Sequence, residues 1–290
     1  MTIGESLQYG IKIIGQRDTI LLLSHITGRP SAYILLHQNE YLPNANLFME
    51  YVTRRKQGEP LQYIIQQWDF MGQTFRTDSR ALIPRPETEL LVEEAMAFLS
   101  QWEQSLPLSI LDLCTGSGCI AISLASSGNY NITAADISPE ALTLAKENAK
   151  KNEKKISFIE SNLFSNITGT FDLIISNPPY ITTAEMDGLS ETVLNYEPHI
   201  ALHGGTDGMD IYRQLIPQSL NYLNTGGALF LEIGPPEVKD IMQETGFKNI
   251  QLKNDYAGHP RILSGICQTV MYMPGSVIPG LTRNLANFIF

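Results

Sequence analysis

Four consecutive residues, Asn177-Pro178-Pro179-Tyr180, combine side chains and backbone constraints that suit the recognition of a planar NH₂ group. The two prolines restrict the backbone and remove two N–H donors, so the loop is expected to be rigid and to present carbonyl acceptors. The side-chain oxygen of Asn177 and the carbonyl of Pro178 could together accept both protons of one NH₂ group. Tyr180 would supply a flat wall beside that group.

An amide-like nitrogen held in this way becomes a candidate methyl acceptor. Its lone pair is delocalised, and two acceptors would shift the nitrogen toward a pyramidal geometry that aims the lone pair at a methyl donor. We assign no general base, because the methylated nitrogen is cationic and acidic enough to lose its proton to water or to a carbonyl. Asn177, Pro178 and Tyr180 are therefore the predicted catalytic residues, acting through proximity and orientation while a sulfonium cofactor supplies the reactivity.

A second segment with chemical meaning runs from Asp112 to Gly118 and links a predicted buried strand to a helix. Gly116 and Gly118 permit positive φ and close approach of a ligand, and the free N–H groups of the helix face the same place. Asp136 ends the next strand, where a carboxylate can accept hydrogen bonds from two ribose hydroxyls. The spacing Gly116-x-Gly118-x-x-Ala121 also satisfies a dinucleotide fingerprint, so these residues alone leave a nicotinamide cofactor open.

Strands and helices alternate around these motifs. Apolar spacing predicts helices after Pro86 and over residues 118–126 and 139–151. Expected strands cover residues 108–113, 131–136, 156–160, 171–176 and 228–233. This alternation predicts an α/β fold with a parallel sheet, whose ligands bind beyond the carboxyl ends of the strands. Two more strands, over residues 247–253 and 262–273, lack an intervening helix and should form an antiparallel hairpin at one sheet edge.

A small helical domain is predicted over residues 1–58, because apolar residues from Ile3 to Ile14 are spaced for one helical face. Capping signals are Thr2 with Glu5, the N-cap candidates Asp18 and Ser31, and the terminal glycines Gly15, Gly28 and Gly58. Residues 59–83 are predicted to form a β-hairpin linker, with strands over 62–70 and 74–83 and a turn at Met71-Gly72. The catalytic domain then covers residues 84–273, and residues 274–290 are expected to be a disordered tail.

Hydrophobicity, cysteine spacing and net charge disfavour several classes of function. The chain has 290 residues, of which 43% are hydrophobic, and its apolar runs fall well short of a membrane span, so we expect a cytoplasmic protein with no membrane association. Cys114, Cys119 and Cys267 lack metal-ligand spacing, which predicts free thiols and no metal site. The net charge of −10 disfavours direct nucleic-acid binding and favours a protein or small-molecule substrate.

With these residues in view, the sequence resembles the PrmC/HemK family, the bacterial N5-glutamine methyltransferases of class I peptide-chain release factors. The similarity extends over residues 6–273. The most specific segment is 83–89, with the sequence Ile-Pro-Arg-Pro-Glu-Thr-Glu, whereas Asn-Pro-Pro-Tyr is shared with nucleic-acid amino-methyltransferases. Other matching segments are residues 59–60, 63–64, 112–118, 196–198, 201–202, 204–208, 231–234 and 257–261.

The resemblance implies a seven-stranded Rossmann-like class I methyltransferase domain, with an N-terminal helical domain that helps to dock the release factor. The implied substrate is the glutamine of that factor's Gly-Gly-Gln motif, and the enzyme is expected to act as a monomer. Residues implied to bind S-adenosylmethionine are Cys114, Thr115, Gly116, Ser117, Gly118, Asp136 and Leu163, with Asn177 bordering both ligands. Residues implied to bind the substrate are Asn177, Pro178, Pro179 and Tyr180, with Arg85 and Glu89 close by.

Three positions depart from the family pattern. Cys114 stands where the family usually has glycine, Asn162 where aspartate is common before the residue near the adenine, and Gln66 where the hairpin often has glycine. The first two changes put the adenine contacts in doubt and leave the fold prediction intact. For Arg85 and Glu89, a salt bridge at the start of a helix is the alternative to a role in the site.

Other functions remain to be weighed. An enzyme that methylates an exocyclic base nitrogen would use the same pocket after base flipping, but it should present a basic face, and the basic residues 54–56 and 150–155 are isolated clusters. A nicotinamide-dependent oxidoreductase has no use for a rigid double-proline acceptor loop. A noncatalytic binding module is disfavoured because the expected cofactor and acceptor residues are all present.

Overall fold

Short helices build the N-terminal part of the chain, and their ends are set by local sequence. Helix α1 (Ile3–Ile14) begins at a capping box, in which Thr2 and Glu5 satisfy each other's backbone N–H groups, and it ends at Gly15. Helix α2 (Gln16–Thr27) ends at Gly28 in the left-handed conformation, as the glycine predicted. The further helices are α3 (Ser31–Leu36), α4 (Ala45–Lys56) and α5 (Leu61–Ile65).

Two of the expected caps are wrong. Asp18 lies inside the first turn of α2, whose N-cap is Gly15, and Ser31 is the first residue of α3 rather than the residue before it. A carboxylate in the first turn still interacts favourably with the helix dipole, and Asp18 also pairs with Arg55 of α4. The sequence signal therefore marked the right helix ends, displaced by one to three residues.

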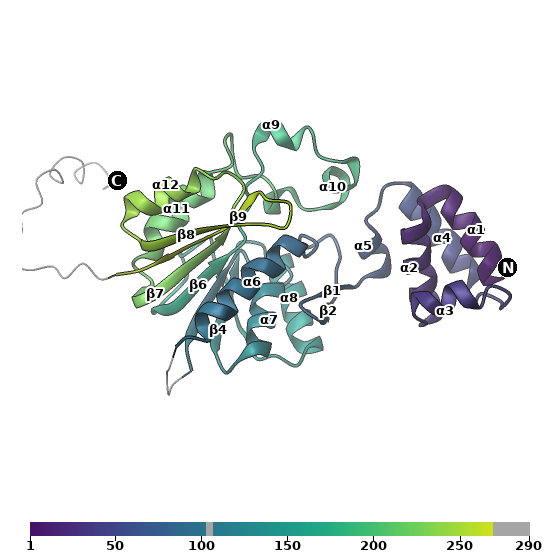
Figure 1. The fold of residues 1–290 in the computed structure, drawn as a ribbon, viewed down its shortest axis with the longest axis horizontal. Coiled ribbons are helices and arrows are strands. Elements are labelled where there is room, and N and C mark those ends of the chain that lie inside the picture. Colours follow the sequence, from purple (N-terminus) through teal and green to yellow (C-terminus); the bar gives the residue numbers. More distant parts are fainter. Residues whose placement is uncertain (103–106, 269–290) are drawn as a thin grey trace, which may run out of the picture.

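The N-terminal helices enclose a hydrophobic core of their own. Apart from Leu42, its buried members come from α1 to α5, and they include Leu22, Leu23 and Phe48. Figure 1 shows these helices at one end of the molecule, with α5 and a short hairpin between them and the large sheet. The structure is a computed structural model that describes residues 1–102 and 107–268. No helix within the described ranges is long and apolar enough to cross a membrane.

The hairpin between the two parts is shorter than expected. Strands β1 (Trp68–Phe70) and β2 (Gln73–Phe75) pair antiparallel, with the predicted turn at Met71-Gly72. The expectation of strands over 62–70 and 74–83 is corrected, because residues 62–65 belong to α5 and the chain after Phe75 runs without a regular element to α6. Gln66 ends α5 in a left-handed conformation with a φ of 54°, which explains why glycine is usual there.

A seven-stranded mixed sheet forms the larger part, in the order β5-β4-β3-β6-β7-β9-β8. The parallel strands are β3 (Ser109–Leu113), β4 (Asn131–Asp136), β5 (Ser157–Glu160), β6 (Phe171–Ser176) and β7 (Leu223–Glu232). Strands β8 (Lys248–Asn254) and β9 (Pro260–Ile266) are antiparallel, which confirms the edge hairpin. Strand β9 ends earlier than expected, and residues 269–273 and the expected tail lie outside the described residues.

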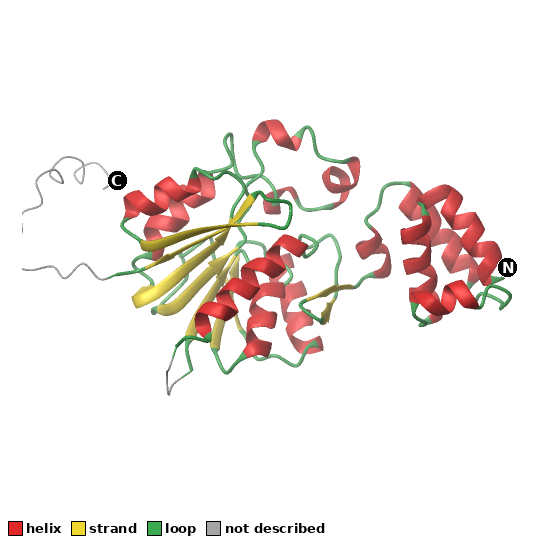
Figure 2. Cartoon of the chain, in the orientation of Figure 1, coloured by secondary structure: helices red, strands yellow, loops and turns green. Residues whose placement is uncertain are grey.

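Helices cover both faces of this sheet (Figure 2). Helices α6 (Pro86–Leu99) and α7 (Cys119–Ser127) pack on one face, and α8 (Pro139–Lys151) lies beside α7. Helices α11 (Asp210–Ser219) and α12 (Val238–Thr245) pack on the other face. Between β6 and α11 the chain forms α9 (Thr183–Met186), α10 (Glu191–Tyr196) and a 3₁₀ turn (His199–Ala201).

The strand order predicts a ligand-binding crevice at the carboxyl end of β3. From β3 the chain moves outward through β4 and β5, and it then returns to the other side of β3 with β6. Neighbouring strands whose connections diverge in this way leave an opening at their carboxyl ends. The loops that follow β3 and β6 carry residues 114–118 and 177–180, so both motifs are brought to one edge of the sheet.

Candidate active site

A cavity of about 400 Å³ opens at the carboxyl ends of β3, β4 and β6. It brings together residues that are far apart in the chain, from the linker before α6 to the loops after three strands. Nine of the predicted site residues line it: Arg85, Cys114, Thr115, Gly116, Ser117, Asp136, Leu163, Asn177 and Pro179. Gly118, Pro178, Tyr180 and Glu89 do not line it.

The loop after β3 is a tight turn held by backbone hydrogen bonds. Gly116 and Gly118 have φ values of 55° and 80°, and the Gly118 N–H donates to the Thr115 carbonyl over 2.9 Å. A Cβ at Gly118 would lie 3.1 Å from the Cβ of Ala145, so this glycine allows α7 to start close against α8. Cys114, where the family usually has glycine, also has a positive φ of 58°.

Asp136 closes one side of the cavity. Its carboxylate accepts from the Gly116 N–H at 2.8 Å and from the Ser138 N–H at 2.9 Å. Burial raises the pKa of Asp136. Each carboxylate oxygen still has a lone pair free, so the side chain could accept from the two hydroxyls of a ribose.

Ser117 gives a direct indication that a polar ligand fits here. Its hydroxyl is buried, and beyond a weak interaction with the Cys119 thiol it has no hydrogen-bond partner among the described residues, although the residue lines the cavity. Buried polar atoms without partners are uncommon, and one that borders a cavity indicates a ligand that supplies the missing bond. The rest of the wall is largely apolar, with Leu113, Ile137 and Leu163 among its members, as a nucleoside with a flat base requires.

Asp112, which precedes the loop, is a residue whose role was not predicted. It is fully buried, and one carboxylate oxygen accepts from the Thr115 hydroxyl at 2.6 Å and from the Ala121 N–H at 3.2 Å. Burial raises the pKa of Asp112 to about 7. By joining the turn to the first residues of α7, Asp112 fixes the shape of the loop after β3. A charged residue in an otherwise apolar strand was the available signal.

The Asn177 side chain is oriented by a polar chain that begins in the core. The Asn177 Nδ2 donates to the Thr88 hydroxyl at 3.0 Å, and that hydroxyl donates to Glu232 Oε2 at 2.7 Å. Neither the Asn177 Oδ1 nor the Pro178 carbonyl accepts a hydrogen bond from a described residue. The loop therefore has the two free acceptor oxygens that the sequence predicted, with Asn177 itself at the cavity wall.

Tyr180 makes contacts that the sequence did not predict. Its hydroxyl donates to Glu232 Oε1 at 3.2 Å, and its ring lies so close to Gly234 that a Cβ there would come within 2.5 Å of the ring. The guanidinium of Arg261 lies 5.7 Å from the ring centre. Tyr180 is not among the residues that line the cavity, and its contacts with Glu232 and Arg261 tether the loop, so its role as a wall beside the substrate group stays a prediction.

Arg85 and Glu89, predicted to lie together near the site, have different surroundings in the structure. Arg85 lines the cavity and forms an ion pair of 2.6 Å with the buried Glu197, whose other oxygen accepts from the Ile83 N–H. Glu89 lies on α6 and accepts from the Met71 N–H at the hairpin turn, away from the cavity. The matched segments 83–89 and 196–198 thus meet through Glu197, a contact that sequence reasoning did not foresee.

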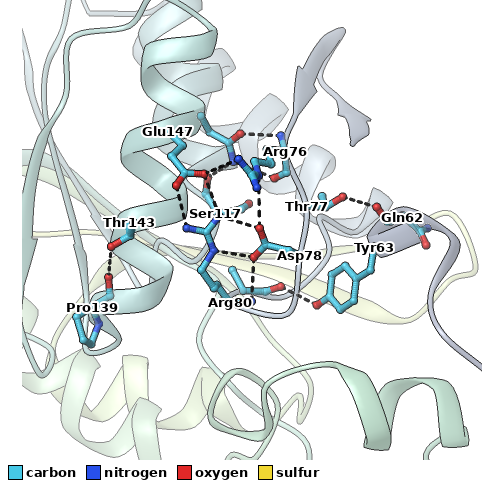
Figure 3. A network of polar contacts seen from close by, with 12 residues as sticks. Gln62, Tyr63, Arg76, Thr77, Asp78, Arg80, Ser117, Pro139, Thr143 and Glu147 are labelled. Atoms are coloured by element: carbon cyan, nitrogen blue, oxygen red, sulfur yellow. Dashed lines mark hydrogen bonds and ion pairs between the residues drawn. The ribbon is translucent and has the colours of Figure 1, made fainter. Parts of the chain in front are cut away.

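The linker wall of the cavity is held to α8 by a polar network (Figure 3). Arg80 lines the cavity, and its guanidinium donates to Asp78 at 2.7 and 2.8 Å and to Glu147 of α8 at 2.9 and 3.0 Å. The Tyr63 hydroxyl of α5 donates to the Ala81 carbonyl at 2.9 Å. This network connects the N-terminal helices, the linker and the wall of the cavity.

Comparison with known proteins agrees with this geometry. Residues 14–65 match the family model of the PrmC N-terminal domain, and residues 91–255 match that of the methyltransferase small domain. The release factor glutamine methyltransferase of Lactococcus lactis is 40% identical over 246 residues, covering 79% of this chain and 90% of that protein. The enzyme of the same name from Koribacter versatilis is 37% identical, covering 91% of this chain and 98% of that protein.

Solved structures support the fold. The hMettl16 catalytic domain, solved in complex with MAT2A 3'UTR hairpin 6, matches with a TM-score of 0.52 at 14% identity, over 78% of this chain and 82% of that one. The 16S rRNA N2 G1207 methyltransferase RsmC of T. thermophilus, in complex with AdoMet and guanosine, matches with a TM-score of 0.51 at 17% identity, over 70% and 50%. The matched family models and the relatives from Lactococcus lactis and Koribacter versatilis show that the chain belongs to the PrmC/HemK family of release factor glutamine methyltransferases.

Proposed function

We propose that this protein transfers the methyl group of S-adenosylmethionine to the side-chain amide nitrogen of the glutamine in the Gly-Gly-Gln motif of a class I release factor. The observation that carries the proposal is the pair of free acceptors, Asn177 Oδ1 and the Pro178 carbonyl, on a loop beside the cofactor cavity. The names of the relatives that share most of the chain support the choice of acceptor.

The cofactor would lie along the loop after β3. In this proposal residues 114–117 form the floor, the Asp136 carboxylate accepts from the ribose hydroxyls, and Leu163 lies near the adenine. The bound cofactor supplies an electrophilic methyl group on a sulfonium. Gly118 acts indirectly, by letting α7 begin close to α8, because it does not line the cavity.

The protein's part in the reaction is to hold and orient the amide. Asn177 Oδ1 and the Pro178 carbonyl would accept its two protons, which directs the nitrogen lone pair toward the methyl group. Tyr180 holds the loop in place through Glu232, and Arg85 stays at the cavity wall through Glu197. Pro179 lines the cavity and adds rigidity.

The N-terminal part is proposed to dock the release factor. Residues 1–58 would form the docking domain and residues 84–273 the catalytic domain, joined by the linker. The matched family models, over residues 14–65 and 91–255, are compatible with this division.

A label-partition assay tests the choice of acceptor. The protein is incubated with S-adenosylmethionine labelled in the methyl group, together with a purified release factor or with DNA or RNA. We expect label on the release factor and none on nucleic acid. Label on a base would replace this proposal with exocyclic base methylation, which uses the same two acceptors.

Asn177→Ala tests the assigned role of the amide. Loss of an acceptor that acts in the transition state should lower kcat by about 100-fold, while the Kd for S-adenosylmethionine changes by less than about threefold. Single-turnover kinetics and cofactor titration measure the two quantities. Equal losses in both would mean that Asn177 serves the cofactor pocket rather than the acceptor.

A further inference from the structure

The hydrogen bonds behind Asn177 have a direction that can be worked out proton by proton. The Thr88 hydroxyl contacts two groups, Glu232 Oε2 at 2.7 Å and the Asn177 amide at 3.0 Å. A hydroxyl has one proton, and an ionised carboxylate can only accept. When Glu232 is ionised, the Thr88 proton must therefore point to Glu232, which leaves only a lone pair for the amide. The atom of Asn177 that faces Thr88 must then be the nitrogen.

The hydrogen bond to Thr88 also decides which atom of the Asn177 amide faces the cavity. With Nδ2 turned to Thr88, the acceptor Oδ1 is left for the cavity side. If the amide were flipped, it would present a donor, and two N–H groups would face each other where the substrate amide should bind. The two ends of an amide have the same shape, so only the hydrogen-bond partners select between them.

The surroundings of Glu232 keep both of its carboxylate oxygens as hydrogen-bond acceptors. The residue is 1% exposed at the end of β7, and its second oxygen accepts from the Tyr180 hydroxyl at 3.2 Å. Arg261 of β9 donates to that hydroxyl at 3.3 Å and to the Ile233 carbonyl at 3.0 Å. The tyrosine proton is thus directed to Glu232 by Arg261, which can only donate. Both carboxylate oxygens of Glu232 act as acceptors, Oε2 from the Thr88 hydroxyl and Oε1 from the Tyr180 hydroxyl.

We propose that Glu232 and Thr88 are positioning residues that fix the orientation of the Asn177 amide, and through it the preference for glutamine over glutamate in the substrate loop. The inference rests on the proposed function, because it takes Asn177 Oδ1 as the acceptor for the substrate amide. Glu232 does not line the cavity. Thr88 does line it, but the Thr88 hydroxyl is used by its two partners, so that hydroxyl acts on the reaction through Asn177.

Three variants test the proposal through kinetics. Thr88→Val keeps the shape and removes both hydrogen bonds, and Thr88→Ser restores the hydroxyl. Thr245→Val removes a hydroxyl bonded only to the backbone of α12 and serves as the matched control. We expect Thr88→Val to lower kcat by about 10- to 100-fold with the Kd for S-adenosylmethionine within about twofold of wild type. Thr88→Ser should retain most of kcat, and Thr245→Val should leave it unchanged.

A second readout separates orientation from stability. A release factor whose Gly-Gly-Gln is changed to Gly-Gly-Glu is used as an inhibitor, because its carboxylate oxygens accept hydrogen bonds and should be repelled by an outward Oδ1. In Thr88→Val and Glu232→Gln the amide is free to turn and present its NH₂. The affinity for the Glu-bearing factor relative to the Gln-bearing one should therefore rise by about tenfold.

The outcomes are distinct. If the relative affinity is the same in wild type and in both variants, or if Thr88→Val and Thr88→Ser lose kcat equally, the orienting role is wrong even though the enzyme methylates glutamine. If wild type does not modify the release factor at all, the proposed function fails. Solvent exchange of the Asn177 side-chain NH₂, measured by NMR, then tests the orientation alone, and the inference requires faster exchange in Thr88→Val than in wild type and Thr245→Val.

Discussion

At the scale of single residues, Glu232 carries the most unusual electrostatics of the site. Burial raises the pKa of Glu232 to about 7, and the Thr88 and Tyr180 hydroxyls and the positive charge of Arg261 oppose that rise. Glu87, on the same helix as Thr88, adds to it through its negative charge. The carboxyl group therefore changes its charge close to neutral pH.

The raised pKa of Glu232 makes the stability of the fold depend on pH. The pKa of Glu232 lies near 7 in the folded protein and near its ordinary value of 4.5 in the unfolded chain, so the folded state binds the extra proton between these values. Glu232 therefore favours the folded state below pH 4.5, and this contribution is lost as the pH rises to about 7, by at most about 1.4 kcal/mol per pH unit. Only the ionised form forces the Thr88 proton away from Asn177.

We accordingly expect kcat to rise as the pH passes through about 7, while the free energy of unfolding falls. Glu232→Gln should flatten both profiles, because its amide does not titrate. Steady-state rates and denaturant unfolding at matched pH values measure the two profiles. A kcat profile of Glu232→Gln that keeps the wild-type inflection would assign the titration to another group. Asp112, whose pKa is also raised to about 7, contributes a parallel slope to stability that the comparison of the two proteins cancels.

Cys114 offers a second prediction at this scale. It adopts a φ of 58°, a left-handed conformation that costs a residue with a Cβ about 1 kcal/mol or more. Cys114→Gly should remove that strain and raise the free energy of unfolding by about 1 kcal/mol, without lowering the affinity for S-adenosylmethionine. Cys119→Gly is the control, because Cys119 begins α7 and gains nothing from glycine. Urea unfolding measures the free energy of unfolding of both variants. A less stable Cys114→Gly would show that the contacts of the thiol outweigh the strain.

At the scale of elements, the linker between the hairpin and α6 is as important to the cavity as the strands. Arg80 joins the linker to α8 through Asp78 and Glu147, and Arg80 also lines the cavity (Figure 3). Asn148 of α8, fully buried, adds hydrogen bonds to both backbone groups of Arg76 and to the Ser117 carbonyl. The linker and the loop after β3 are thus held by one helix.

Arg80→Ala should therefore weaken cofactor binding. Releasing the linker adds disorder that cofactor binding must remove, so the Kd for S-adenosylmethionine is expected to rise by about 5- to 10-fold, with kcat at saturating cofactor changed less. Arg54→Ala is the matched control, since Arg54 also makes a two-point contact with a carboxylate, that of Glu59, but lies outside the cavity. Calorimetric titration measures both variants. An unchanged Kd for Arg80→Ala would mean that the linker is held without this network.

The element scale also shows where sequence reasoning was strong and where it was weak. The strands over residues 131–136 and 171–176 were predicted to the residue, because their apolar runs are bounded by charged or polar residues and loops. Residues 62–65 were taken for the start of a strand because the whole run from 62 to 70 was read as β-rich. Tertiary contacts such as the Tyr63–Ala81 bond stabilise a short helix there instead.

At the scale of the whole molecule, the residues that sequence reasoning missed share one property. Thr88 and Glu232 are 144 residues apart, and Ile83 and Glu197 are 114 apart, yet each pair is joined by a hydrogen bond. Spacing along a chain reports local structure, so it located the loop after β3 and the Asn177 loop but not the groups that support them. The contacts of Tyr180 were not foreseen for the same reason, because its partners come from β7 and β9.

The architecture assigns separate tasks to the two parts of the chain. The sheet holds the cavity, whereas α1 to α4 lie at the far end of the molecule with their own core (Figure 1). The two parts touch where the Tyr196 hydroxyl of α10 donates to the Gln57 carbonyl at 3.3 Å. A large protein substrate that inserts one loop into the cavity could rest on both, which a free amino acid could not.

The most direct test of the account is to locate the transferred methyl group. A purified class I release factor is incubated with this protein and S-adenosylmethionine, digested, and sequenced by fragment mass spectrometry. The account predicts one added methyl group on the side chain of the Gly-Gly-Gln glutamine, and none when Asn177→Ala is assayed for the same time. A methyl group on any other residue, or an unmodified glutamine with active wild-type protein, would contradict it.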